Sequence, residues 1–562
     1  TDCIVLSGCR RGEIASLILN GQSWAARETA RQYLACLGRE NFYLEMQDNL
    51  LPGNHLLNHA LLQIAEDLKI PPVATNNVHY LHHEDFIVHD LLTCVRALSG
   101  VEDIHPWRPF NGENYFKSPR QMSDLFCFCP RALENTLHIA EQCEEIFSSP
   151  RPLHFPAYAL PAGKDAGTLL HQLTFDGARQ RYGRLSRAVT DRLEYELGVI
   201  TSMGFASYFL LVWDLVRFAR REGIRYAGRG SAADSLVAYC LYISEVDSLK
   251  RGLLFERFMS PERSQLPDID IDFEHGRREQ VIAYVYKKYG AERVARVATC
   301  NTFKARSALR DIGKALGFGE EELGPIAKTL PHTYADNIRP LMQALPELRN
   351  SPLREERFHL LLDICAKIAG FPRFLGMHSS GLVISDCPLD TLTPLQYSPS
   401  GLVMTQFDKD DIEDLGLVKL DLLSLRTMSV INDTCRYIES SGDRLDYEQI
   451  PLNDPETYAL ISSGETLGVF QLESPAQRAL QSQLEASGIE DVVASMALIR
   501  PGPIKGNMVD PYIARRQGKE PVTYLHPLLE PILKKTCGVI LFQEQVMEIA
   551  LLPGRPINCA GL

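Results

Sequence analysis

The first third of the chain alternates between two hydrophobic periods. Short apolar runs are typical of buried strands, whereas an apolar residue every three or four positions is typical of an amphipathic helix. These patterns predict strands at residues 3–8, 42–46 and 71–75, with helices between them at 25–37 and 55–68. Because strands alternate with helices, we expect an α/β unit with parallel pairing. A helix-rich run over 166–223 follows, and its last apolar helix ends at Arg221.

The middle of the chain contains strict alternation, Pro-Asp-Ile-Asp-Ile-Asp-Phe at residues 267–273. On a strand, Asp268, Asp270 and Asp272 would point to one face and the apolar residues to the other. Three carboxylates on one face repel one another unless a cation neutralises them. Mg²⁺ binds to one or two protein carboxylates together with phosphates and water. We therefore prefer a metal site to the alternative, an acidic strand or turn exposed to solvent.

A glycine-rich segment precedes this stretch. Gly230 permits a tight backbone, and Ser231 is predicted to cap the helix that follows it. The N-terminus of that helix, beside Arg229, would suit a triphosphate, and Arg257 could bind the same phosphates in bidentate fashion. The alternative is a simple turn and helix cap.

Two later segments carry further candidates. In Leu-Val-Lys-Leu-Asp-Leu-Leu, at 417–423, Lys419 and Asp421 share one strand face. If this strand lies beside the acidic one, Asp421 is a third metal ligand and Lys419 a phosphate contact; otherwise the two form a structural ion pair. In Arg-Pro-Gly-Pro, at 500–503, we expect the prolines to forbid regular structure and to fix the pose of Arg500.

Length and composition indicate a multidomain protein of ordinary globular type. The chain has 562 residues, of which 45% are hydrophobic and 23% charged, and its net charge is −13. A polyanion site would therefore be a local basic surface, or else the basic clusters are solvated helix faces. These clusters are Arg217, Arg220, Arg221, Arg225 and Arg229; Arg277 and Arg278; Lys287 and Lys288; and Arg515, Arg516 and Lys519.

The cysteines and the hydropathy pattern predict a reducing, cytoplasmic location. The 14 cysteines form no Cys-x-x-Cys pair, and no apolar run is long enough to span a bilayer. Thr1 stands at the start, and the first residues look like the middle of a domain, so we expect a fragment.

Several potential metal ligands lie close together after the third predicted strand: His79, His82, His83, Glu84, Asp85 and His89. Imidazoles and carboxylates at this density could bind a metal. Asparagines occupy both positions before Val78, however, and amides are poor ligands. We therefore favour a vestigial or structural role for this cluster.

Eight motifs occur together in the chain, and as a set they resemble one family. They are GRGSAADSLVAY (228–239), LLFERFMSPER (253–263), PDIDIDF (267–273), VMTQFD (403–408), LVKLDLLSLRT (417–427), GVFQLES (468–474), RPGP (500–503) and GVILFQEQVM (538–547). The set is similar to the bacterial C-family DNA polymerases, which are the alpha subunits of DNA polymerase III and their error-prone relatives. The N-terminal third resembles the polymerase-and-histidinol-phosphatase (PHP) domain of those proteins, without its beginning.

This resemblance implies a multidomain α/β and α fold with a mixed palm of the nucleotidyltransferase type. The implied domains are PHP at 1–147, palm at 148–299 and 377–426, a helical thumb inserted at 300–376, and largely helical, incomplete fingers at 427–562. The reaction implied is addition of deoxynucleoside triphosphates to the primer 3′ end of primer-template DNA. A sliding clamp or mutasome partners would bind through a C-terminal region that is absent here.

The resemblance also implies roles for the residues named above. Asp268, Asp270 and Asp421 match the family's catalytic aspartates and would hold two Mg²⁺ ions, while Asp272 has less weight. The residues implied in triphosphate and primer binding are Arg229, Gly230, Ser231, Arg257, Lys419 and Arg500.

Departures from the family pattern bear on the role of the protein. Segment 371–381 is similar to the error-prone branch, and Asp234 stands where replicative members usually have glycine. We therefore expect a translesion-type polymerase, with the replicative alpha subunit as the alternative. Asn77 replaces an aspartate of metal-binding PHP domains, although His79 is kept, which puts a PHP metal in doubt. The family pattern stops near residue 550.

Two readings from other functional classes stay open at this point. One is a PHP-type metal phosphoesterase or exonuclease that depends on His79 and its neighbours. The other is a catalytically incomplete fragment that binds DNA.

Overall fold

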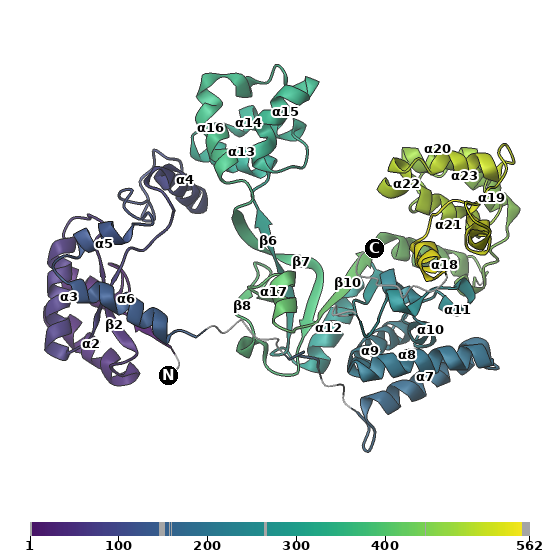
Figure 1. The fold of residues 1–562 in the computed structure, drawn as a ribbon, viewed down its shortest axis with the longest axis horizontal. Helices are drawn as coiled ribbons and strands as arrows, with labels where there is room; N and C mark the ends of the chain where they lie inside the picture. The colour runs from purple at the N-terminus through teal and green to yellow at the C-terminus, as the bar shows by residue number, and fades with distance from the viewer. Residues whose placement is uncertain are drawn as a thin grey trace. The chain divides into compact units, whose positions relative to one another are not determined.

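The computed structural model describes residues 3–144, 152–156, 158, 160–262, 267–443 and 445–552. By its internal contacts the chain divides into two units. One unit comprises residues 1–150 and 300–375, and the other comprises residues 151–299 and 376–562 (Figure 1).

The first unit begins with a small parallel sheet in the order β1-β2-β3. The strands are β1 (Val5–Leu6), β2 (Phe42–Gln47) and β3 (Pro72–Thr75), and both pairings are parallel, as the sequence predicts. Its helices are α1 (Glu13–Leu19), α2 (Ser23–Leu37), α3 (Asn54–Leu68), α4 (Phe86–Ala97), α5 (Pro119–Leu125) and α6 (Pro130–Gln142). Apolar side chains of α1, α2, α3 and β2 form one core.

Residues 300–375 of the same unit are mainly helical, as expected from the sequence. The helices are α13 (Ala305–Ala315), α14 (Glu320–Thr329), α15 (Ile338–Ala344) and α16 (His359–Lys367). Their apolar faces share a core with Val88, Leu91 and Cys94 of α4.

The second unit is organised around a mixed seven-stranded sheet in the order β4-β5-β10-β7-β6-β9-β8. The strands are β4 (Tyr226–Arg229), β5 (Asp270–Glu274), β6 (Val294–Thr302), β7 (Pro372–Ile384), β8 (Leu395–Tyr397), β9 (Val403–Thr405) and β10 (Lys419–Leu425). β5 runs parallel to β10 and antiparallel to β4, and β10 runs antiparallel to β7.

The main core of this unit lies on one face of the sheet. Ile271 and Phe273 of β5 and Leu420 and Leu422 of β10 are buried there against helix side chains. The helices are α7 (Ala166–Tyr182), α8 (Arg187–Ser202), α9 (Ala206–Arg221) and α12 (Arg278–Tyr289), of which α7 contacts both α8 and α9 (Figure 1). Because side chains alternate along a strand, the aspartates between these apolar residues point to the other face.

The chain after β10 is largely helical over its described part, as predicted, and its regular structure there is all helix. Its α-helices are α18 (Arg426–Ser440), α19 (Pro455–Ser463), α20 (Pro475–Leu484), α21 (Ile489–Leu498), α22 (Pro501–Lys505), α23 (Val509–Arg516), α24 (Glu530–Leu533) and α25 (Gln543–Leu551). The departure from the family pattern after residue 550 falls mostly outside the described residues.

No single helix in the described ranges is long and apolar enough to cross a membrane. Helices α8 and α9, which are bent sharply relative to each other, reach the required length and hydropathy only when the two are taken together. Many side chains of both helices belong to the main core.

Candidate active site

The neighbouring strands β5 and β10 bring Asp270 and Asp421 together, and Asp268 lies close to both. Leu422 of β10 lies beside Ile271 of β5 in parallel register, which places Asp421 next to Asp270. The adjacency that the sequence left open is therefore confirmed. Asp268 lies just before β5 rather than on it, and carboxylate oxygens of Asp268, Asp270 and Asp421 lie within 4.8 Å of one another.

The three carboxyl groups differ in acidity. Desolvation, together with repulsion from Asp270 and Asp421, raises the pKa of Asp268 to about 6. Desolvation and the charge of Asp421 also raise the pKa of Asp270. The pKa of Asp421 is lowered, because hydrogen bonds from Lys419 and Ser380 outweigh the effect of its burial. The three carboxyl groups thus concentrate negative charge, and the neighbouring side chains neutralise it only in part.

Asp421 is held by neighbours on both sides. Lys419, two residues earlier on the same strand face, forms an ion pair with its Oδ2 atom. Ser380 Oγ of β7 donates to its Oδ1 atom at 2.8 Å. Lys419 and Asp421 thus form an ion pair at the carboxylate cluster, while their roles as phosphate contact and metal ligand stay predictions.

His378 lies next to Ser380, with its Nδ1 atom 3.3 Å from Ser380 Oγ. Its Nδ1 atom accepts a hydrogen bond from the backbone N–H of Gly381 at 2.9 Å, so the ring proton is on Nε2. Burial lowers the pKa of His378, although the charge of Asp421 acts in the opposite direction. The imidazole is therefore a neutral acceptor. Segment 371–381 marked a branch of the family in the sequence, but nothing in it revealed that His378 and Ser380 adjoin the aspartates.

Arg229 lies on the other side of the cluster. In the antiparallel pairing of β4 and β5 it stands directly opposite Asp270. Its Nε atom lies 3.6 Å from Asp270 Oδ2, and its Nη1 atom 3.8 Å from Asp272 Oδ2. Gly230 follows with φ of +68°, a conformation that glycine adopts most easily. Arg229 and Lys419 together supply two positive charges against four carboxylates.

The predicted cap at Ser231 is wrong. Ser231 lies in a 3₁₀ turn over Gly230–Asp234, and the helix begins later as α10 (Leu236–Cys240) with Ser235 as its N-cap. The anion site predicted beside Arg229 stays a prediction, but it cannot use the N-terminus of α10. The carboxylate of Glu196, which is fully buried, accepts hydrogen bonds from the backbone N–H groups of Leu236 and Val237, both at 3.0 Å. An internal carboxylate therefore already occupies the helix N-terminus.

Arg257 contacts two acidic groups in the structure. Its Nε atom lies 3.8 Å from Asp234 Oδ2, and its Nη1 atom forms an ion pair with Glu544 of α25. Burial raises the pKa of Asp234 to about 6, although the charge of Arg257 opposes this. Arg257 thus links the loop after β4 to the C-terminal helices.

The expectation that prolines forbid regular structure around Arg500 is wrong. Arg500 is the N-cap of α22, and Pro501 and Pro503 lie in the first turn of that helix. The first backbone N–H groups of a helix have no intrahelical acceptor, so proline costs little there. The Arg500 side chain is exposed.

Tyr208 of α9 is a site residue that the sequence did not reveal. Its hydroxyl is fully buried and accepts a hydrogen bond from the backbone N–H of Ile269 at 3.1 Å. Ile269 lies between Asp268 and Asp270, so this contact fixes the backbone that carries both carboxylates. In the sequence, Tyr208 looks like any other aromatic residue of an apolar helix.

The basic clusters neither form a purely solvated face nor stand free for a polyanion. Arg217 and Lys288 both pair with the buried carboxylate of Asp214, at 3.0 and 2.5 Å. Arg277 donates to the backbone carbonyl oxygens of Glu222 and Gly223. Several side chains of the predicted basic clusters therefore form ion pairs or hydrogen bonds within the protein.

The histidine cluster after β3 shows ring contacts rather than a ligand set. The rings of His79 and His89 lie 4.7 Å apart between centroids, and His82 and His83 line a cavity of 840 Å³. Within the described ranges, three ligand atoms converge at only two places in the chain, and this cluster is neither of them.

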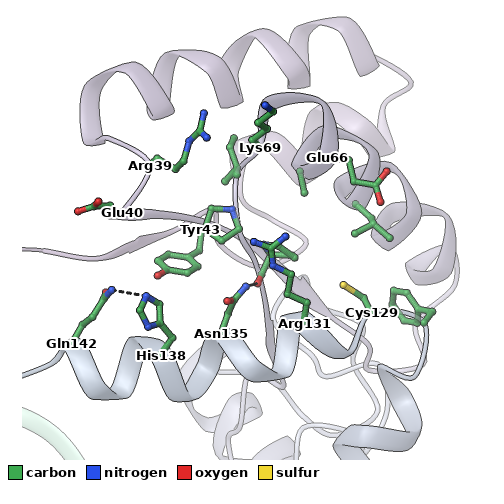
Figure 2. A pocket seen from close by; sticks show the side chains of 16 residues that line it. Arg39, Glu40, Tyr43, Glu66, Lys69, Cys129, Arg131, Asn135, His138 and Gln142 are labelled. Carbon is green, nitrogen blue, oxygen red and sulfur yellow. Dashed lines mark hydrogen bonds between the residues drawn. The ribbon is translucent and has the colours of Figure 1, made fainter.

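A second cavity in the first unit, of 1090 Å³, lies between α6 and the residues around β2 and α3. Arg39, Lys69, Arg131 and His138 are among the side chains that line it (Figure 2). It contains none of the residues that the sequence singled out.

Comparison with known proteins places these features in a family. Residues 168–424 match the family described as the bacterial DNA polymerase III alpha NTPase domain, and residues 427–554 match the finger domain of the same subunit. The chain is 56% identical over 549 residues to a protein of Symbiobacterium thermophilum named error-prone DNA polymerase, covering 97% of this chain and 50% of that protein.

Replicative subunits are also similar to the chain. It is 38% identical to the DNA polymerase III subunit alpha of Bacillus subtilis and 37% identical to that of Aquifex aeolicus, over 97% of this chain in both cases and 49% and 50% of those proteins. The chain thus spans about half the length of these relatives. With two adjoining domains matched and relatives aligned along nearly its whole length, the chain belongs to the bacterial DNA polymerase III alpha family.

Proposed function

We propose that the chain carries the catalytic centre of a DNA-directed DNA polymerase, which adds deoxynucleotides to a primer 3′ end by two-metal nucleotidyl transfer. The observation that carries this proposal is the convergence of the carboxylates of Asp268, Asp270 and Asp421, whose oxygen atoms lie within 4.8 Å of one another. Family membership supports this class of reaction, and the carboxylate cluster supports the location of the catalytic centre.

The residues present fit the binding of Mg²⁺. Hard cations prefer oxygen ligands, and this cluster offers three carboxylates. The Oδ1 atom of Asp270 is buried and has no hydrogen-bond partner. A buried acceptor without a partner is costly, and a cation would satisfy it. We therefore propose Asp268, Asp270 and Asp421 as the ligands of two Mg²⁺ ions. When bound, the ions would supply charge stabilisation to the attacking and leaving oxygens.

The basic side chains around the cluster are proposed to bind the triphosphate. Lys419 and Arg229 now balance aspartate charge, and they can turn to the phosphates once the carboxylates are otherwise neutralised. Arg257, now paired with Glu544, is proposed to bind the same phosphates. Gly230 and Ser231 would let the backbone approach them, and Arg500 would contact the primer end or the nucleotide.

In the reaction, the primer 3′-hydroxyl loses its proton to solvent and its oxygen forms a bond to the α-phosphorus, while the bond from that phosphorus to the oxygen of the leaving pyrophosphate breaks. The chain's own part is to hold the two reactants in line and to stabilise charge. Tyr208 and Ser380 serve this indirectly, because they position Asp268, Asp270 and Asp421.

Single-nucleotide primer extension with Mg²⁺ tests the proposal. We compare the wild type with Asp270→Ala and Asp421→Asn, and with Asp336→Ala, an acidic residue of the helical segment 300–375, as the matched control. Loss of a ligand worth several kcal/mol should lower incorporation by about a thousandfold or more. Circular dichroism should show all four proteins folded.

Each alternative has its own outcome in this experiment. Equal incorporation by the wild type and Asp270→Ala would refute the site. Loss of folding in Asp421→Asn alone would make Lys419 and Asp421 a structural ion pair. Activity that survives Asp270→Ala but not His79→Ala would favour the phosphoesterase reading. Salt-dependent DNA binding without incorporation would favour the incomplete fragment.

We further propose that the polymerase belongs to the error-prone branch and acts in repair or damage tolerance. The match to a protein named error-prone DNA polymerase is higher, at 56% identity, than the matches to replicative subunits at 38% and 37%. The test is misincorporation frequency on an undamaged template and extension past an abasic site. Fidelity equal to that of a replicative alpha subunit would favour the replicative alternative.

The proposed function also implies a division of the chain into domains. We propose PHP at 1–147, palm at 148–299 and 377–426, thumb at 300–376 and fingers at 427–562. The match of residues 427–554 to the finger domain supports the last of these. A cytoplasmic location and a sliding clamp or mutasome partner follow from the proposed function.

A further inference from the structure

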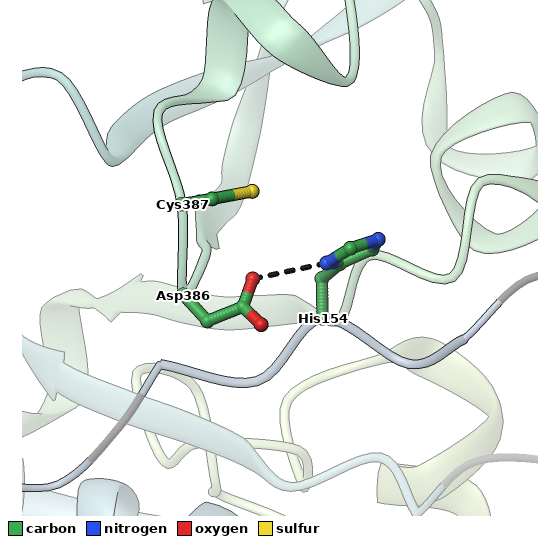
Figure 3. A group of neighbouring side chains, drawn as sticks. All are labelled: His154, Asp386 and Cys387. Atoms are coloured by element: carbon green, nitrogen blue, oxygen red, sulfur yellow. Dashed lines mark hydrogen bonds and ion pairs between the residues drawn. The ribbon is translucent and has the colours of Figure 1, made fainter.

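A second convergence of ligand atoms lies away from the aspartate cluster. Nitrogen, oxygen and sulfur atoms of His154, Asp386 and Cys387 lie within 4.8 Å of one another. His154 Nδ1 and Asp386 Oδ1 are 2.9 Å apart (Figure 3). More than two hundred residues separate His154 from the other two, so their meeting is a property of the fold and not of local sequence.

The backbone that carries His154 is fixed to the sheet unit. The N–H of His154 donates to the carbonyl of Gly416 at 2.8 Å, and His154 forms a parallel bridge with Leu417. Gly416 has φ of +74°, and a Cβ atom there would lie 2.3 Å from the carbonyl oxygen of Pro152. Only a residue without a side chain allows this close approach.

The corner that carries Asp386 and Cys387 is fixed as well. Just before it, the N–H of Ser385 donates to the carbonyl of Arg293 at 3.0 Å. Just after it, the N–H of Leu389 donates to the carbonyl of Glu292 at 2.9 Å. Both halves of the cluster are thus held by backbone hydrogen bonds before any ligand arrives, which lowers the ordering cost of binding.

We propose that His154, Asp386 and Cys387 form a Zn²⁺ site that fastens the segment around His154 to the corner after β7. Imidazole, carboxylate and thiolate are the three ligand types that zinc takes in proteins, and their mutual distances suit one tetrahedral ion. The Asp386 side chain is 44% exposed, which leaves room for water as the fourth ligand. On binding, the Cys387 thiol loses its proton to solvent and the sulfur joins the metal.

This site would be separate in chemistry from the polymerase centre. The aspartate cluster offers only oxygen and suits Mg²⁺, whereas a sulfur and a nitrogen ligand select a softer ion. The inference therefore does not depend on the proposed function.

Cobalt titration of the reduced, metal-free chain tests the site. Co²⁺ substitutes for Zn²⁺, and a cobalt–thiolate bond gives an ultraviolet charge-transfer band that oxygen ligands cannot produce. We expect the band to saturate at one equivalent and to disappear when Zn²⁺ is added. Cys387→Ser should abolish it and His154→Ala should weaken binding at least tenfold, while Cys300→Ser, a half-buried cysteine elsewhere, should leave it unchanged.

Hydrogen exchange gives a second readout on folded protein. Zn²⁺ should slow exchange of the His154 amide in the wild type and in Cys300→Ser, but not in Cys387→Ser. Absence of a thiolate band at stoichiometric Co²⁺, or a band that persists in Cys387→Ser, would overturn the proposal. His154 and Asp386 would then be a plain ion pair.

Discussion

The hydrogen bond from Ile269 to Tyr208 offers a sharp test of how the aspartate segment is held. Tyr208→Phe removes only the hydroxyl oxygen, and it leaves the buried N–H of Ile269 without an acceptor. An unsatisfied buried donor costs about 1–3 kcal/mol. Because the variant keeps the ring, the apolar packing of α9 should stay intact.

Hydrogen exchange of the peptide covering residues 267–273 measures this cost locally. At about 1.4 kcal/mol per factor of ten, the lost hydrogen bond should speed exchange by roughly 5- to 150-fold. Primer extension should fall as well, because a shift of about 1 Å in a catalytic group can cost a hundredfold in rate.

Tyr286→Phe is the matched control. The hydroxyl of Tyr286 is buried but has no hydrogen-bond partner, so its removal should leave exchange unchanged. Equal exchange rates for Tyr208→Phe and Tyr286→Phe would show that Tyr208 does not hold the aspartate segment, and the reasoning would fail.

Three further predictions concern other contacts of the site. Glu544→Gln weakens the partly exposed ion pair to Arg257, which is worth about 1 kcal/mol. Because Arg257 is then available for the phosphates that we propose it binds, the KM for the incoming nucleotide should fall about fivefold, and a raised KM would contradict this. Asp234 has a raised pKa of about 6, so its contribution to stability is present at low pH and lost as pH rises from about 4 to 6; urea unfolding should show Asp234→Asn gaining up to about 3 kcal/mol on the wild type across that range, and a constant difference would count against it. Gly381→Ala would place a methyl group 3.0 Å from His378 Nδ1, so its unfolding free energy should fall by about 1–3 kcal/mol, and an unchanged urea midpoint would exclude the clash.

The local pattern of hydrophobic and polar residues predicted most strands and helices, but it could not predict which of them lie side by side. The alternation of Asp270 with Ile271 correctly predicted which side chains enter the core, because strand periodicity is a local property. The sequence could not establish that β5 and β10 are neighbours, because strand pairing depends on the path of the whole chain. The structure shows that they are, since Leu422 pairs with Ile271.

The errors have two origins, one tertiary and one local. Ser231 and Ser235 are both plausible helix caps, and the choice between them depends on Glu196, which lies far away in the sequence. The error at Pro501 and Pro503 is local: proline breaks the interior of a helix, but the first turn of a helix accepts it. Side chains that act through tertiary contacts, such as Tyr208, carry no signal of their own.

The buried carboxylate of Glu196 has a consequence for ligand size. Because it accepts the hydrogen bonds of the backbone N–H groups of Leu236 and Val237, a small anion such as sulfate cannot bind to these donors at the end of α10. The triphosphate that we propose as a ligand would then be bound by the side chains of Arg229 and Lys419, which flank the aspartates. Under the proposed function, we therefore expect a triphosphate, whose several phosphate groups can contact separate cations, to bind more tightly than inorganic phosphate.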